Sequence, residues 1–196
     1  MISESLVRTA GWSAIANSVL FIISTITLML MFAVSMAWGK VNDATSVIWI
    51  LTFIPIAVYL FRLVRPVNST LSLVALIVGI LCMIAFALLQ AALVVNLVRF
   101  EQTFGPIMYL WVGISFWMIV SALLARSAGL LPNYLVGMTL ILGLTYIVAA
   151  AGFLLNGWEH PLALAGFAGS VIVGPFWGLL LGRYLLNTSI PVPAGT

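Results

Sequence analysis

The residues best suited to acid–base chemistry are Glu159 and His160, which are neighbours in a short polar segment. A carboxylate and an imidazole can exchange protons with a substrate, and an enzyme built on them would need Glu101 to join them at one surface. Nothing in the sequence supplies a nucleophile for this pair. His160 is the only histidine, which excludes a haem held by two histidines and a zinc site with several histidines. We therefore predict no catalytic residue, no metal site and no cofactor.

A second set of candidates consists of uncharged polar groups inside apolar stretches. Asn17, Gln90 and Asn96 are the strongest of these, and each either lines a ligand cavity or forms a hydrogen bond between helices. Bonds between helices are the more common arrangement in membranes. Trp117 and Tyr146 lie deeper in apolar stretches than the other large aromatic residues, where they either contact a flat ligand or pack in the core. These five residues are the candidate ligand-binding set.

Small residues recur at every fourth position near the end of the chain: Gly166, Ser170, Gly174, Gly178 and Gly182. This spacing places them on one slowly drifting stripe of a helix, where they let a second helix backbone approach closely. The stripe predicts tight helix packing. The partner is either another helix of the same chain or a second copy of the protein, which would make a homo-oligomer.

The composition indicates what must position these residues. The chain has 196 residues, of which 64% are hydrophobic and 6% are charged, whereas soluble domains carry about 25% charged residues. The seven basic residues are dispersed rather than clustered, so nucleic acid is not an expected partner. Cys82 is the only cysteine, and no internal disulfide can form. The expected surroundings are a lipid bilayer.

Long intervals without charge predict how often the chain crosses the bilayer. Each interval is about 18 residues or longer, enough for a helix that spans the hydrocarbon core. A cleaved signal peptide is the alternative for the first stretch, but that stretch exceeds the usual ~7–15 residues. We predict an all-α bundle of six transmembrane helices in one domain. Their ranges are 11–38, 45–64, 70–98, 106–126, 133–156 and 161–186, with a short tail at 187–196.

Basic residues predict the orientation of these helices, because loops rich in Lys and Arg stay in the cytoplasm. One side carries Arg8, Arg62, Arg65, Arg126 and Arg183, and the other carries Lys40 and Arg99. Both termini are therefore predicted to be cytoplasmic. Asp43, Glu101 and Glu159 fall in the outer connections, so no ionisable group is expected at the centre of a span, which disfavours ion-coupled transport.

Two predicted helices carry a polar or small-residue face that we expect to point inward. On the first helix the face consists of Ser13, Asn17, Ser24 and Ser35, and on the third it consists of Ser72, Ala75, Gly79, Phe86 and Gln90. Pro55 in the second helix and Pro175 in the sixth each remove a backbone hydrogen bond, so both helices are expected to bend.

Two short segments resemble terminal features of uncharacterised bacterial membrane proteins. The segments are Val7-Arg8-Thr9-Ala10-Gly11-Trp12 and Pro175-Phe176-Trp177-Gly178-Leu179-Leu180-Leu181-Gly182-Arg183. The families they resemble have about six helices and no assigned function. The resemblance implies a bacterial inner-membrane location and a compact six-helix bundle, and it implies no catalytic residues.

Three hypotheses for function follow from these patterns. The first is a non-enzymatic membrane protein that binds a lipophilic small molecule or a partner within the membrane. The second is a small transporter or channel for a neutral solute, which would use Asn17, Gln90, Asn96 and Tyr146 as hydrogen-bonding groups. The third is a membrane enzyme that uses Glu159 and His160 at its outer face.

Overall fold

The computed structural model describes residues 2–187, so the predicted tail at 187–196 lies outside the described residues except for Asn187. The described part consists of helices and short connections. The helices are α1 (Glu4–Ala33), α2 (Trp38–Leu51), α3 (Phe53–Val64), α4 (Ser69–Val94), α5 (Phe100–Ser127), α6 (Asn133–Asn156), the short 3-10 helix η1 (Gly157–Glu159) and α7 (Pro161–Asn187). Together they form six helical segments long and apolar enough to span a membrane, with α2 and α3 sharing one segment. The predicted all-α bundle of a multi-pass membrane protein is confirmed.

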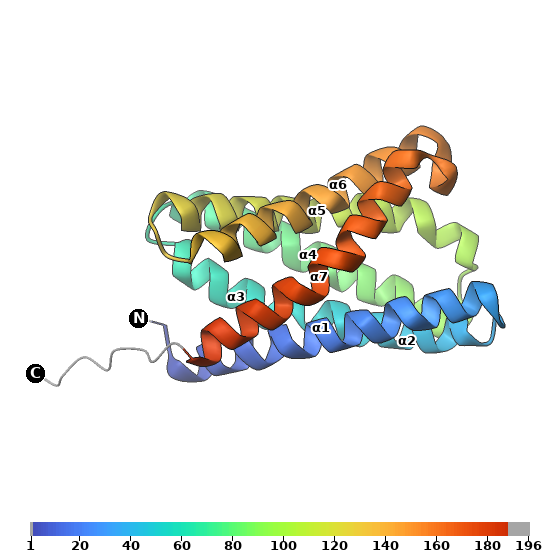
Figure 1. The fold of residues 1–196 in the computed structure, drawn as a ribbon, viewed down its shortest axis with the longest axis horizontal. Coiled ribbons are helices and arrows are strands. Elements are labelled where there is room, and N and C mark those ends of the chain that lie inside the picture. Colours follow the sequence, from blue (N-terminus) through green and yellow to red (C-terminus); the bar gives the residue numbers. More distant parts are fainter. Residues whose placement is uncertain (1, 188–196) are drawn as a thin grey trace, which may run out of the picture.

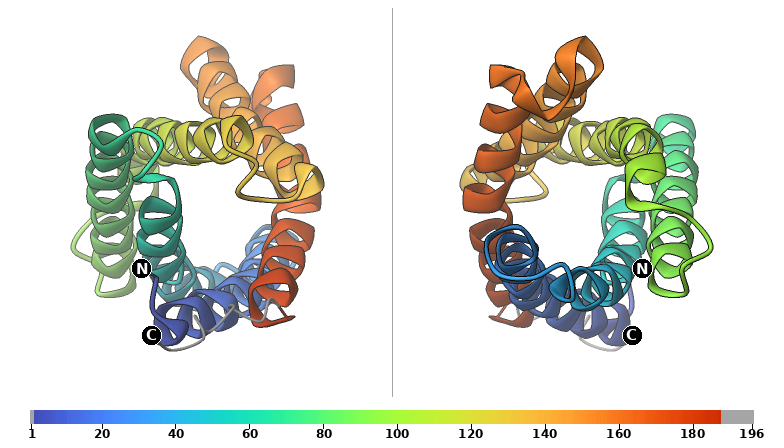
Figure 2. Two further views of the ribbon diagram at one scale, coloured as in Figure 1. Left: turned by 90° about the vertical axis from the view of Figure 1, so that its left-hand side faces the viewer. Right: turned by 90° about the vertical axis from the view of Figure 1, so that its right-hand side faces the viewer.

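The six spans form a closed ring in chain order. Each helix packs against the next one along the chain, and α7 closes the ring by packing against α1. Figure 2, which looks along the bundle, shows this ring, and Figure 1 shows that α1 begins and α7 ends at the same end of the bundle. We call that end the terminal end and the opposite one the outer end. The ring therefore brings the first and last helices together.

Several helices extend further than the intervals between charges predicted. The helix α1 begins at Glu4 rather than at residue 11, because the Ser3 hydroxyl caps it by accepting the Leu6 N–H at 3.3 Å. The helix α5 begins at Phe100 rather than at residue 106, since the Gln102 side chain accepts the Arg99 N–H at 2.8 Å. Charged residues are tolerated in the end turns of a membrane helix, where they reach the interface. A charged residue therefore does not mark where these two helices begin.

Other ends fall short of the prediction. The helix α1 ends at Ala33 rather than at residue 38, so Ser35 lies beyond it and is exposed instead of facing inward. The helix α4 ends at Val94 rather than at residue 98. Asn96 follows it with a φ of 57°, a left-handed conformation that asparagine tolerates better than most residues and that ends a helix. The placement of Asn96 within a membrane helix was wrong.

The second span breaks at Thr52, where α2 ends and α3 begins. Pro55 has no N–H to continue the helical hydrogen bonds through this point. A side chain of α1 supports the break: Asn17 Nδ2 donates to the Trp49 carbonyl at 3.2 Å and to Thr52 Oγ1 at 2.9 Å. The helix α7 continues through Pro175 without such a break.

The stripe of small residues on α7 packs inside the ring against two different helices. A Cβ atom at Gly166 would lie 2.6 Å from the Thr145 carbonyl oxygen of α6, and one at Gly178 would lie 2.7 Å from the Ala14 carbonyl oxygen of α1. The outer half of α7 therefore contacts α6 and its terminal half contacts α1, as its diagonal course in Figure 1 shows. We call these two contacts the α7 seam.

Candidate functional site

A cavity lies in the outer half of the bundle, where α7 leans onto α6 and away from α1. Within residues 2–187, the backbones of α1 and α5 do not come into contact there. The cavity has a volume of about 100 Å³. Its walls come from α1, α2, α4, α5, η1 and α7, and they consist of Phe21, Ser24, Thr25, Leu28, Asn42, Asp43, Ser46, Trp49, Phe86, Gln90, Phe100, Thr103, Phe104, Ile107, Met108, Trp111, Trp158 and Phe167.

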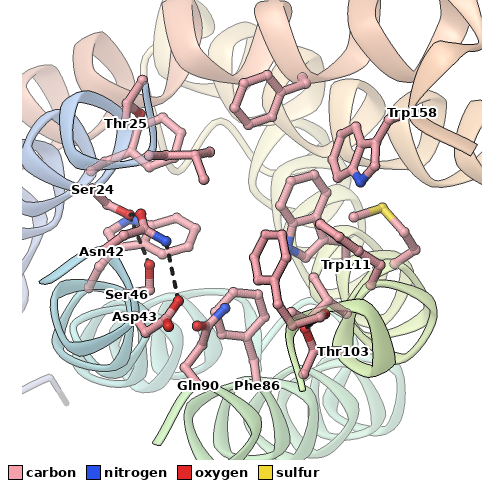
Figure 3. Close-up of a pocket in the computed structure, with 18 residues that line it drawn as sticks. Ser24, Thr25, Asn42, Asp43, Ser46, Phe86, Gln90, Thr103, Trp111 and Trp158 are labelled. Atoms are coloured by element: carbon pink, nitrogen blue, oxygen red, sulfur yellow. Dashed lines mark hydrogen bonds between the residues drawn. The ribbon is translucent and has the colours of Figure 1, made fainter. Parts of the chain in front are cut away.

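Polar side chains of α1 and α2 form one wall, drawn on the left of Figure 3. Ser24 Oγ donates to Asn42 Oδ1 at 2.9 Å, and since a hydroxyl has one proton, Ser46 Oγ donates to Ser24 Oγ across 2.8 Å. Asn42 Nδ2 in turn donates to Asp43 Oδ1 at 3.4 Å. This polar wall, defined by Ser24, Asn42, Asp43 and Ser46, is thus a connected chain of hydrogen bonds that ends on a carboxylate.

Aromatic side chains enclose the rest of the cavity and account for eight of its 18 lining residues. Trp49 stacks on Phe21 with 5.0 Å between ring centroids and meets Phe86 edge-on at 6.0 Å. Trp111 and Trp158 lie on the opposite side from the polar wall (Figure 3). A ligand in this cavity would touch the polar wall on one side and aromatic faces on the others.

Three buried polar atoms of lining residues have no hydrogen-bond partner among residues 2–187: Trp49 Nε1, Trp158 Nε1 and Gln90 Oε1. Gln90 reaches the cavity from α4, and Figure 3 shows it beside Asp43. A buried polar atom without a partner costs about 1–3 kcal/mol relative to a bonded one, so a water molecule or a ligand that bonds to it stabilises the site. The cavity therefore has bonding capacity that the protein itself does not satisfy.

A larger hollow adjoins the cavity at the outer end of the bundle. It has a volume of about 510 Å³ and is lined by Met31, Met36, Gly39, Lys40, Asp43, Leu93, Asn96, Val98, Arg99, Phe100 and Glu101. We call it the vestibule. Asp43 and Phe100 line both hollows, so they mark the boundary between them.

Towards the terminal end the bundle is filled by large rings. Phe53 stacks on Trp177 with ring centroids 5.8 Å apart and meets Trp117 edge-on at 6.2 Å. Trp177 Nε1 donates to Thr139 Oγ1 at 2.8 Å, which fixes its ring. These side chains are fully buried. The bundle is therefore packed below Trp49, on the side of the cavity away from the vestibule.

The structure separates the five predicted ligand-binding residues. Gln90 lines the cavity, whereas the Asn17 amide is used at the break between α2 and α3. Trp117 and Tyr146 are buried in the core. Tyr146 packs against Trp111, a cavity-lining residue, with ring centroids 5.1 Å apart. Asn96 is exposed and lines the vestibule. Only Gln90 of the five thus reaches the cavity directly.

The remaining candidates also have definite places. Gly166, Ser170, Gly174, Gly178 and Gly182 are all buried within the chain. Glu159 and Glu101 are exposed, and His160 Nδ1 accepts the Leu162 N–H at 3.2 Å at the start of α7. In the described residues no hydrogen bond or ion pair joins Glu159, His160 and Glu101. The arrangement caps a helix and does not assemble an acid–base site.

Of the polar wall, sequence reasoning identified only Ser24 as facing inward, because Asn42 and Asp43 were assigned to a connection and Ser46 was left unremarked. The helix α2 begins at Trp38 rather than at residue 45, so these residues lie on it and are buried. Helical spacing would have identified the face, since Asn42, Ser46, Trp49 and Phe53 are separated by four, three and four residues. The charge of Asp43 was read as a helix boundary.

Comparison with known proteins adds no assignment. No protein-family model matches the chain, and no curated protein or solved structure matches it either. The chemistry of the cavity is therefore the basis for a functional proposal.

Proposed function

We propose that this protein binds a small, mainly apolar molecule with one polar end in the outer cavity, and that it works by binding rather than by catalysis. The observation that carries the proposal is the cavity itself: aromatic walls, a connected polar wall and three unpartnered buried polar atoms surround about 100 Å³ of space. Binding sites combine apolar walls with a few converging polar groups in this way. Interior cavities of about 150 Å³ hold benzene, which has six heavy atoms, so about 100 Å³ takes a ligand of about four to five heavy atoms.

The distribution of basic residues supports a location for this site. Arg8, Arg62, Arg65, Arg126 and Arg183 all belong to the terminal end of the bundle, opposite the cavity. Under the positive-inside rule the terminal end faces the cytoplasm, and the cavity opens toward the outer leaflet. The resemblance of both chain ends to bacterial membrane proteins favours a bacterial inner membrane.

Binding is proposed in preference to transport of a neutral solute because of the closed terminal half. A solute would have to pass Phe53, Trp117 and Trp177, whose rings fill the bundle below the cavity. Asn17, which a transport path would use, already donates its side-chain N–H groups to the Trp49 carbonyl and to Thr52 Oγ1. The packed rings of the terminal half therefore favour a binding pocket over a transport path.

The test fills the cavity and measures binding of small probes. Thr25 lines the cavity and is half-buried, whereas the adjacent Ile26 is 51% exposed on the lipid-facing side of α1. Thr25→Trp should fill the cavity, and Ile26→Trp provides a control of the same size on the same helix. The purified protein in detergent is titrated with n-butylammonium, n-butanol and n-butyrate, and binding is followed by calorimetry.

We expect at least one probe to bind the wild type and the Ile26→Trp variant but not the Thr25→Trp variant. Thermal unfolding of all three proteins, measured without probe, shows whether the variants are folded. If no probe binds the wild type, or if Thr25→Trp binds as well as Ile26→Trp, the cavity is not a binding site and the proposal is wrong.

A further inference from the structure

A buried carboxylate without a cation lies at the entrance to the cavity. Asp43 is 7% exposed, and its one hydrogen bond within the described residues is the 3.4 Å contact from Asn42 Nδ2. The ion pair present in residues 2–187 joins Arg8 to Glu4 at the other end of the bundle. Removing a charge from water without a partner is unfavourable, and ionisable residues inside membrane spans usually have a specific partner. Asp43 therefore lacks the partner that its position calls for.

Within residues 2–187, none of the hydroxyl groups that line the cavity donates a hydrogen bond to the Asp43 carboxylate. The Ser24 proton goes to Asn42 and the Ser46 proton to Ser24, so neither hydroxyl donates to the carboxylate. Gln90 Oε1, beside Asp43 in Figure 3, accepts no hydrogen bond. Thr103, which lines the cavity from α5, donates to the Phe100 carbonyl at 2.7 Å. A cationic hydrogen-bond donor at this corner of the cavity would bond to both the Asp43 carboxylate and Gln90 Oε1.

The aromatic walls of the cavity also favour a cationic ligand. Cations are attracted to the faces of Trp, Tyr and Phe rings within about 6 Å, and the attraction increases when water is excluded. Trp49 and Phe86 lie near the polar wall, and Trp111 and Trp158 face it across the cavity. A bare metal ion would leave these walls without contact, whereas an organic cation would place its alkyl groups against them.

We propose that the ligand is a small organic ammonium ion, whose charged N–H groups bind Asp43 and Gln90 Oε1 while its alkyl part occupies the aromatic end of the cavity. This inference rests on the binding function proposed above and adds the chemical class of the ligand. The route is through the vestibule, where Asp43 is the first buried acidic group that an entering cation meets.

Probes of equal size distinguish this inference from the binding function itself. n-Butylammonium and n-butanol have the same chain and differ in charge at the polar end. We expect n-butylammonium to bind the wild type about tenfold more tightly than n-butanol, and n-butyrate to bind more weakly than both. Equal binding of the ammonium ion and the alcohol would overturn the ammonium inference and leave the binding function standing. Failure of every probe would remove both.

Replacement of the carboxylate tests the role of Asp43. Asp43→Asn keeps the shape of the side chain and removes its charge, so it should weaken n-butylammonium binding about 30-fold while n-butanol binding changes by less than about threefold. Equal losses for the two probes would contradict a charge pair. The comparison of probes on the wild type does not depend on folding of this variant.

Two further measurements address competing cations. Lys40 lies one helical turn from Asp43 in the vestibule, and Lys40→Gln should leave n-butylammonium binding unchanged or make it tighter. Loss of binding in this variant would contradict the assignment.

Sodium chloride, titrated alone, should produce no binding signal that depends on Asp43. A sodium signal abolished by Asp43→Asn would assign the site to a metal ion and overturn the inference.

Discussion

Along α7, small residues let neighbouring helices approach until backbone atoms touch, whereas between α1 and α5 large rings keep the helices apart. Gly166 and Gly178 have no room for a methyl group, because carbonyl oxygens of α6 and α1 occupy that space. In the outer half, the rings of Trp49, Phe86 and Trp111 line the space that remains between helices. The same bundle therefore contains a seam that only the smallest side chains allow and a cavity that the largest ones enclose.

The two regions also differ in how their polar groups are satisfied. Ser18 and Ser170, at the α7 seam, each donate to a carbonyl of their own helix, at 3.2 and 2.7 Å. Around the cavity, three buried polar atoms have no partner. Stability should therefore depend mainly on the seam and binding mainly on the cavity, and the predictions below test this division in order of expected effect.

The largest effect is expected at the seam. Gly166→Ala should lower the free energy of unfolding in detergent by about 3 kcal/mol, because the added methyl group meets backbone atoms of α6 that cannot move independently. Gly137→Ala on α6 is the control, since a Cβ there meets nothing within 4 Å and alanine favours helix by about 0.5–1 kcal/mol. Chemical unfolding of both variants gives the difference. Similar stability of the two would show that the seam is not tightly packed.

A smaller loss is expected where α1 supports the break in the second span. Asn17→Leu removes the hydrogen bonds to the Trp49 carbonyl and Thr52 Oγ1. Because hydrogen bonds between membrane helices average about 0.6 kcal/mol each, the expected destabilisation is about 1 kcal/mol. Probe binding in the cavity should be nearly unchanged. A variant that keeps its stability but loses binding would place Asn17 in the site instead.

At the cavity, a substitution should maintain or raise the free energy of unfolding instead of lowering it. Gln90→Met removes a buried acceptor that has no partner, so unfolding stability should stay equal or rise by about 1 kcal/mol. Binding of n-butylammonium should become weaker at the same time. This opposition between stability and binding is typical of functional sites. A clear loss of stability would mean that Gln90 has a structural role comparable to that of the seam.

The smallest effect is expected at the outer surface. Replacing Glu159 and His160 together by alanine removes the His160 Nδ1 contact to the Leu162 N–H at the start of α7 and no part of the cavity. The cost in stability should be about 0.5 kcal/mol, and probe binding should be unchanged. A large loss of binding or of a cellular phenotype would revive the acid–base hypothesis for these residues.

The fold could be predicted largely from the sequence, because uncharged stretches of sufficient length have few alternatives to crossing a bilayer. All five residues of the predicted inner face on α4, from Ser72 to Gln90, are indeed buried, since helical periodicity alone decides which residues share a face. Helix ends were less predictable. They depend on caps such as Gln102 and on tertiary burial of charged residues such as Asp43, which a rule based on charge assigns to connections.

The site was predictable only in part for the same reason. Gln90 was found because it lies on a periodic face, while Asp43 was missed because its burial results from the packing of α1 and α4 against α2. Trp117 and Tyr146 are deep in the sequence pattern and deep in the structure, but depth does not distinguish a core residue from a cavity wall. Which buried residues line the cavity depends on the course of α7, which packs against α6 at the outer end and against α1 at the terminal end.

Chemical access to matched cysteines tests the contrast between the open cavity and the closed seam most directly. In a Cys82→Ala background, Ser46→Cys places a thiol in the cavity wall and Ser18→Cys places one in the seam; both serines are buried. A small cationic methanethiosulfonate reagent should label Ser46→Cys rapidly, more slowly when n-butylammonium is present, and Ser18→Cys hardly at all. Equal labelling rates at the two positions, or no protection by n-butylammonium, would contradict the account.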